Sequence, residues 1–155
     1  MRIVPVLLLS CLASPLAAQG ISCPPMLAPT PAGFTLVPRP SPTGFPFRGA
    51  EQTGPRRFDR ISVVDGPESD VMAEAPGTLM PDEGASGRPR PPSLRQRWNL
   101  AGGSPRGHLL VCHYAGTAAV LTRVLPPRTR ECRQSLPVNA RGEISENGPR
   151  SGSCR

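Results

Sequence analysis

The feature that most constrains this chain is the confinement of its strand-like apolar runs to one stretch, residues 98–132. This stretch holds the only Trp, the only Tyr, both His and two of the five Cys. Its two apolar runs, residues 109–114 and 118–125, flank a short turn that contains Gly. Beyond the first 20 residues, apolar side chains elsewhere come singly between Pro, Gly and Arg. The core is therefore expected to begin in this stretch.

Short strand-like segments predict a mainly β fold, a small antiparallel sheet of four to five short strands with a Pro-rich irregular N-terminal arm. Strands are expected at residues 58–64 and 97–100, in the two runs above, and from residue 131. A two-residue hairpin loop at Ala115-Gly116 would place Cys112 opposite Ala119 and Leu110 opposite Leu121. The remaining composition, with 22 Pro, 16 Gly and 4% aromatic residues, allows only one modest core.

The domain organisation follows from the two ends of the chain. Residues 1–18 have a charged start, a short apolar run and small residues, as in a secretory signal peptide. Cleavage is expected after Ala18 or, as an alternative, after Gly20. Residues 19–57 form the Pro-rich arm, and residues 58–155 form a small disulfide-stapled β domain. The protein is therefore expected to be periplasmic or secreted, without a transmembrane segment. The minor alternative is a lipoprotein attached through Cys11.

Removal of the signal peptide leaves four cysteines in an oxidising compartment, so two disulfides are expected. If the strand that contains Cys132 lies beyond the hairpin in the same sheet, Cys112 and Cys132 are about 10 Å apart, too far for a bond. The leading pairing is then Cys23–Cys112 with Cys132–Cys154. If that strand lies on the other side of the hairpin, Cys112–Cys132 becomes possible and Cys23–Cys154 follows.

The charge is uneven along the chain. All 18 basic residues are Arg, and the formal net charge is +7. Residues 61–87 carry six acidic residues and no Arg, whereas residues 88–133 carry nine Arg and one Glu. An Arg-rich face can bind phosphate or carboxylate groups, but the codon bias of a GC-rich genome also explains the Arg content. The candidate anion-binding residues are Arg95, Arg97, Arg123, Arg128 and Arg130.

No residue constellation specifies catalysis. His108 and His113 lie five positions apart on one strand and therefore point to opposite faces, so they cannot share a metal or relay a proton. The acidic residues lie in a Pro/Gly-rich segment without ligand spacing for calcium. Few aromatic residues accompany the Arg residues, which argues against nucleic acid as a partner. We expect no catalytic residues, no metal and no cofactor.

Several short motifs resemble a family of small exported (periplasmic) bacterial proteins whose function is not known. They are Cys23-Pro24, Gly66-Pro67-Glu68, Leu79-x-Pro81-Asp82, Trp98-x-Leu100, Leu110-x-Cys112-x-Tyr114, Thr117, Leu121, Leu125-Pro126, Cys132 and Cys154. The chain departs from the family pattern in its long Pro-rich arm and in lacking an aromatic-rich first strand. The resemblance implies export and a similar fold, and it transfers no catalytic residue.

The sequence therefore leaves the specific function unknown and favours a non-enzymatic periplasmic binding or structural module of the cell envelope. Its expected partner is an envelope protein or an anionic surface component. Two alternatives remain open. One is a small secreted inhibitor or regulator of an envelope hydrolase. The other is an Arg-mediated binder of anionic envelope polymer or lipid, and the oligomeric state is not predicted.

Overall fold

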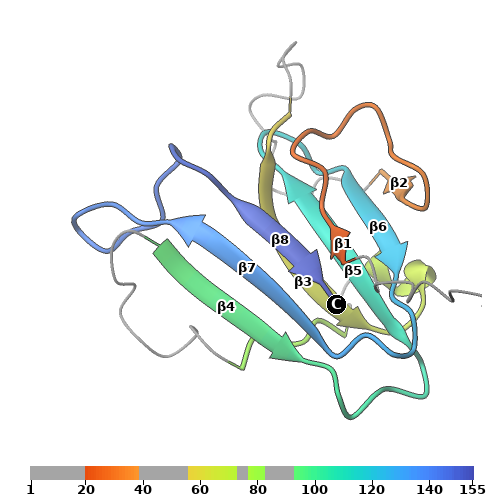
Figure 1. Ribbon diagram of the computed structural model, residues 1–155. Helices are drawn as coiled ribbons and strands as arrows, with labels where there is room; N and C mark the ends of the chain where they lie inside the picture. Colours follow the sequence, from red (N-terminus) through yellow and green to blue (C-terminus); the bar gives the residue numbers. More distant parts are fainter. Residues whose placement is uncertain (1–19, 39–55, 73–76, 83–92) are drawn as a thin grey trace, which may run out of the picture.

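The computed structural model describes residues 20–38, 56–72, 77–82 and 93–155, which form two four-stranded antiparallel sheets (Figure 1). The mainly β class predicted from the sequence is confirmed. The described residues contain eight strands in two sheets, however, where four to five strands in one sheet were expected. The predicted signal peptide, with Cys11, lies outside the described residues, as do residues 39–55 of the predicted arm.

Each sheet combines strands from distant parts of the chain. Sheet I has the order β1 (Ile21–Ser22), β8 (Ser151–Cys154), β7 (Glu131–Pro137), β4 (Ser93–Asn99). Sheet II has the order β2 (Thr35–Val37), β6 (Val120–Val124), β5 (His108–Tyr114), β3 (Phe58–Asp65). A short 3-10 helix, η1 (Glu68–Met72), follows β3. Two strands, β1 and β2, come from residues that the sequence assigned to the irregular arm.

The main core lies between the two sheets. On β5, Leu110, Cys112 and Tyr114 belong to one apolar cluster with Trp98 of sheet I. The indole Nε1 of Trp98 donates a hydrogen bond to the carbonyl oxygen of Leu79 at 2.9 Å, which satisfies its buried polar atom. The other buried members of this cluster are Ile21, Phe58, Ile61, Val63, Leu100, Leu121, Leu125, Cys132 and Cys154.

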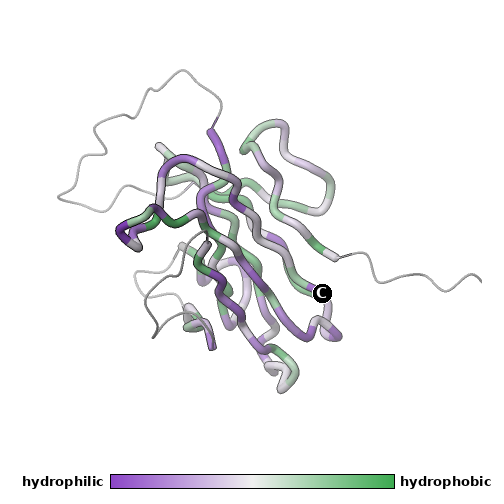
Figure 2. Tube along the Cα trace, turned by 60° about the vertical axis from the view of Figure 1, so that its left-hand side comes forward, coloured by the Kyte–Doolittle hydropathy of each residue, from purple (hydrophilic) through white to green (hydrophobic). Residues whose placement is uncertain are grey.

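The opposite face of sheet II is also apolar. Leu109 and Val111 alternate with the core residues of β5 and form a second buried cluster with Val71 of η1. Glu68 of the same short helix accepts a hydrogen bond from the Thr122 hydroxyl at 2.7 Å. Sheet II is therefore buried on both faces, which explains the nearly continuous apolar runs in its sequence. Along the whole trace, hydrophilic and hydrophobic residues are interleaved (Figure 2).

The two disulfides are Cys23–Cys112 and Cys132–Cys154, the leading pairing from the sequence. The strand order used to argue for this pairing is wrong. The strand that contains Cys132, β7, does not extend the hairpin of sheet II but lies in sheet I beside β8. Cys132 and Cys154 are direct cross-strand partners with a Cα–Cα distance of 4.0 Å. The Cys23–Cys112 bond joins the segment after β1 to β5 and so links the two sheets.

The predicted register of the β5–β6 hairpin is also wrong. Cys112 pairs with Leu121 instead of Ala119, a shift of two residues. Residues 115–119 form a longer loop, in which the Thr117 hydroxyl accepts a hydrogen bond from the Ala119 amide at 3.0 Å. Because side chains alternate with a period of two, this shift keeps every side chain on its expected face.

Candidate partner-binding surface

The outer face of sheet I carries the densest group of Arg residues that the structure describes. On β4, Trp98 points into the core, so Arg95, Arg97 and Asn99 point outward by strand alternation. On β7, Cys132 points inward, and Arg133 lies directly opposite Arg97. The small outward residues of this face are Ser135, Ser151 and Ser153. We call this surface, together with Arg130 and Arg155 at its edge, the arginine face.

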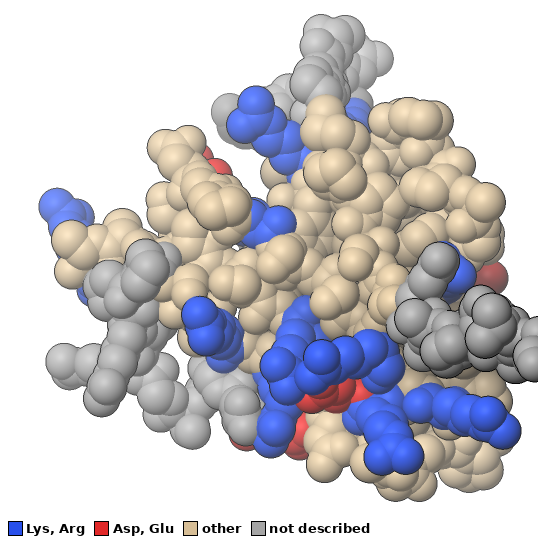
Figure 3. Space-filling view, in the orientation of Figure 1, with Lys and Arg blue, Asp and Glu red and all other residues tan. Residues whose placement is uncertain are grey.

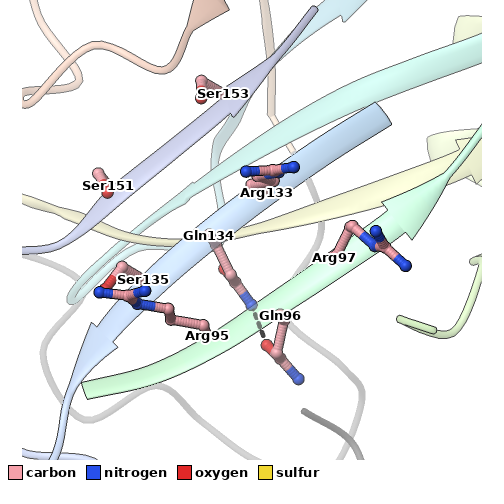
Figure 4. A pocket seen from close by; sticks show the side chains of 8 residues that line it. All are labelled: Arg95, Gln96, Arg97, Arg133, Gln134, Ser135, Ser151 and Ser153. Atoms are coloured by element: carbon pink, nitrogen blue, oxygen red, sulfur yellow. Dashed lines mark hydrogen bonds between the residues drawn. The ribbon is translucent and has the colours of Figure 1, made fainter. Parts of the chain in front are cut away.

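One shallow, open hollow of about 380 Å³ lies over the middle of the arginine face (Figure 4). Its lining residues are Arg95, Gln96, Arg97, Arg133, Gln134, Ser135, Ser151 and Ser153. The Gln134 side-chain amide donates a hydrogen bond to the Gln96 side-chain oxygen. The oxygen of the same Gln134 amide accepts the Ile61 backbone N–H at 2.9 Å. These two contacts anchor the lining of the hollow to β3 of sheet II.

A second hollow, of about 430 Å³, adjoins the first and shares Arg97 with it. Its other lining residues are Asn99, Ala101, Arg130, Glu131 and Arg155. In the space-filling view, basic side chains surround acidic ones at this end of sheet I (Figure 3).

Glu131 is the acidic centre of this second hollow. Its carboxylate accepts hydrogen bonds from Arg155 Nε at 2.6 Å and from Arg133 Nη2 at 2.9 Å. The hydrogen bond from Arg155, followed by the bond and charge of Arg133, holds the pKa of this carboxyl below its usual value. Glu131 is therefore ionised at neutral pH and orients two of the surrounding guanidinium groups.

The arginine face keeps an excess of positive charge. Among the described residues that line the two hollows, five are Arg and one, Glu131, is acidic. Arg97 and Arg133 are direct cross-strand partners, an arrangement of like charges that is unfavourable on its own. Within the described part of the chain, no acidic side chain forms an ion pair with Arg95 or Arg130. This surface is suited to bind carboxylate or phosphate oxygens.

The structure brings together three of the five candidate residues from the sequence, Arg95, Arg97 and Arg130. Arg123 lies elsewhere, on β6 of sheet II, with its guanidinium carbon 5.3 Å from the centre of the Phe34 ring. Arg128 is exposed in the turn between β6 and β7 and lines neither hollow.

The sequence reasoning missed two members of the arginine face, Arg133 and Arg155. Arg133 follows the buried Cys132 in a strand, and successive side chains of a strand point to opposite faces. Its outward direction could therefore have been predicted if the strand had been assigned to a sheet with one exposed face. No pattern in the sequence indicated that Arg155 lies beside β7. It reaches Glu131 because the Arg155 amide donates to the Glu131 carbonyl at 2.9 Å, which extends the β7–β8 pairing.

The two histidines lie apart from this surface. His113 Nε2 and the Ser62 hydroxyl are 3.0 Å apart on sheet II. His108 begins β5 and, five positions away along the strand, points to the opposite face. Among the residues that the structure describes, no group of three His, Cys, Asp or Glu side chains could hold a metal ion. The same residues include no helix that is long and apolar enough to cross a membrane.

Comparisons with known proteins place the chain in a family. No solved structure matches it. An uncharacterized 16.3 kDa protein from the trpG 5′ region of Azospirillum brasilense is 31% identical over 141 residues, which are 89% of this chain and 85% of that protein. The model of the type VI secretion system Tli immunity protein family matches residues 52–155, a range that includes β3 to β8 and the whole arginine face. The chain therefore belongs to the type VI secretion system Tli immunity protein family.

Proposed function

We propose that this protein is an immunity protein that protects its own cell by binding directly to a toxin delivered through type VI secretion. The observation that carries the proposal is the family match over residues 52–155. This range holds six of the eight strands and every Arg residue of the arginine face. Of the hypotheses drawn from the sequence, the small secreted inhibitor is thus the favoured one.

The architecture supports a role in binding. Two disulfides, one of which links the two sheets, restrict the scaffold. The Gln96–Gln134 and Gln134–Ile61 hydrogen bonds anchor the lining of the first hollow to the opposing sheet. A surface that is already ordered before binding loses less conformational entropy when a partner docks. Such a surface suits an inhibitor that acts by occupying its target.

The periplasm is the compartment that we propose for this encounter. Disulfides persist in oxidising compartments, and residues 1–18 have the pattern of a secretory signal peptide. A toxin neutralised there has envelope components within reach. We therefore propose an enzyme that attacks the envelope as the class of toxin.

The test is competition between sister cells of the source bacterium. A strain that lacks the gene for this protein is grown against its parent, which carries an active type VI apparatus. We expect the deletion strain to be killed, and to survive when a plasmid supplies the protein. The parent with an inactive apparatus is the matched control and should not kill. Equal survival of deletion and parent strains in the presence of the active apparatus would contradict the proposal.

The same assay identifies the toxin. Effector genes are deleted one at a time from the attacking parent, and the deletion that abolishes killing marks the partner. The purified toxin and the purified, oxidised immunity protein should then form a complex at stoichiometric concentrations, measured by isothermal titration calorimetry. The absence of a complex would exclude neutralisation by direct binding.

A further inference from the structure

We propose that the arginine face is the surface that docks the toxin and that it receives an acidic segment of that protein, with carboxylates entering the two hollows on either side of Arg97. This inference rests on the proposed function. It adds the location of the interface on this chain and the chemistry of the matching surface on the partner.

In the first hollow, three guanidinium groups project from two neighbouring strands. Residues two apart on a strand are separated by about 7 Å, so Arg95 and Arg97 project side by side from β4. Arg133 projects from the next strand directly opposite Arg97. A carboxylate placed beside Arg95 would accept charge-assisted hydrogen bonds from its guanidinium group. Among the acidic residues that the structure describes, none forms an ion pair with Arg95, so this guanidinium group remains for a carboxylate of the partner.

The adjoining hollow also offers a guanidinium group to an acidic side chain of the partner. There, Glu131 fixes the guanidinium group of Arg155 through a 2.6 Å hydrogen bond. Arg130 is exposed at the same hollow and forms no ion pair with any acidic residue that the structure describes. One carboxylate within the protein thus orients Arg155 and leaves Arg130 for a second carboxylate. Two hollows that share Arg97 therefore match two acidic side chains on one segment.

The shape and the mixed polarity of the arginine face favour a protein, instead of a membrane or a polymer, as its binding partner. The arginine face carries two open hollows of about 380 and 430 Å³, which a shaped protein segment can fill more completely than a flat bilayer surface. Ser135, Ser151 and Ser153 add neutral hydrogen-bonding groups between the charges. Glu131 would repel a uniform polyanion. Arg is enriched in protein interfaces, where its planar fork binds carboxylates at defined positions.

The experiment compares two charge-reversal variants in binding to the toxin identified by the competition assay. The first is Arg95→Glu with Arg130→Glu, two exposed residues without ion pairs to the acidic residues described. The matched control is Arg57→Glu with Arg141→Glu, which changes the net charge equally at two exposed residues outside both hollows. We expect the first variant to bind about 100-fold more weakly and to lose protection. The control should stay within about threefold of wild type.

The outcomes separate this inference from the proposed function. If wild type protects and the Arg95/Arg130 variant binds the toxin as tightly as wild type, the inference is overturned and the immunity function stands. If wild type neither binds nor protects, the proposed function fails as well. Vesicles of phosphatidylcholine with phosphatidylglycerol provide a third arm. Binding to them that depends on Arg95 and Arg130, with unchanged toxin binding, would assign the arginine face to anionic surfaces.

Folding of the variants is checked separately. Thermal unfolding of the oxidised proteins should give similar midpoints for wild type, the Arg95/Arg130 variant and the control. If the charge-reversal variant does not fold, Arg95→Gln with Arg130→Gln replaces it, because this pair removes the charge without introducing new repulsion. Toxin affinity of the folded Gln variant equal to that of wild type would then overturn the inference.

Discussion

The two sheets of this protein use their faces differently. In β5 of sheet II, five of seven residues are buried, because the sheet packs against sheet I on one face and against η1 on the other. In β8 of sheet I, exposed and buried residues alternate strictly. Sheet II therefore commits both faces to the core, whereas sheet I commits one. The polar face left on sheet I is the one that carries the two hollows.

The difference in burial between the two sheets indicates which surface of a small β protein can carry a binding site. The buried side chains on both faces of sheet II contribute to packing, so a polar substitution at one of them carries a large desolvation cost. The outer face of sheet I has no such constraint, and its two hollows are lined by five Arg residues and Glu131. In the proposed binding mode, the toxin docks on the outer face of sheet I, whereas the inner face of the same sheet packs in the core.

The largest effect should come from removing the bond that joins the two sheets. The Cys23–Cys112 disulfide closes a loop with a sequence separation of 89, and the Cys132–Cys154 bond within sheet I closes one of 22. In the chain-entropy relation, Cys23→Ser with Cys112→Ser costs about 4–5 kcal/mol of unfolding free energy, and Cys132→Ser with Cys154→Ser costs about 3 kcal/mol. Urea denaturation of the two double variants shows which of them loses more unfolding free energy. If the Cys132/Cys154 variant were the less stable of the two, the bond within sheet I would contribute more to stability than the bond that joins the two sheets.

The next effect compares the outer faces of the two sheets directly. Leu109, on the outer face of sheet II, is 1% exposed, so Leu109→Ala should lower the free energy of unfolding by about 3 kcal/mol. Arg95→Ala, on the outer face of sheet I, should change it by about 0.5 kcal/mol or less. Chemical denaturation of both variants tests the pair. A large loss for Arg95→Ala would show that the arginine face is also required for the fold.

A smaller effect is expected at Gly152, where β8 of sheet I packs closely against β3 of sheet II. A Cβ on Gly152 of β8 would overlap the side chain of Ile61 and lie 3.0 Å from Phe58 Cζ, both on β3. Gly152→Ala should therefore cost about 2 kcal/mol through overpacking. Gly102→Ala is the matched control, because a Cβ there meets no atom within 4 Å. Equal thermal unfolding midpoints for the two variants would argue against close packing of β8 on β3.

The close approach at Gly152 also explains what the sequence left hidden. The apolar runs of β5 and β6 and the alternation around Trp98 were sufficient to predict an antiparallel β fold. The segment Ser151–Cys154 has almost no apolar character, because its inward positions are Gly152 and a disulfide-bonded cysteine. A strand of this composition is not recognisable from hydropathy, so the second sheet could not be predicted.

The hairpin register was hidden for a different reason. Loop residues 115–119 are held by contacts from a distant segment, with the Ala115 amide donating to the Arg57 carbonyl at 2.9 Å. Local turn preferences do not contain that information. For the candidate surface, the excess of Arg indicated the right region of the chain. It did not show which Arg residues share a face, because that depends on the sheet to which each strand belongs: Arg95 and Arg97 lie on sheet I, and Arg123 lies on sheet II.

The smallest predicted effect concerns the acidic centre of the arginine face. Because hydrogen bonds from Arg155 and Arg133 lower the pKa of Glu131 in the folded protein, its ionised form stabilises the fold above the unfolded-state value near 4.5. This contribution is lost as the pH falls through the lower, folded-state pKa. Glu131→Gln should therefore unfold at a slightly lower urea concentration than wild type at neutral pH, and the difference should disappear in acid.

A double-mutant cycle with Arg155→Gln assigns this effect to the ion pair. The coupling between Glu131 and Arg155 should be present at neutral pH and absent once the carboxyl is protonated. A coupling that persists in acid would indicate a packing role for Glu131, since an ion pair requires the charged carboxylate.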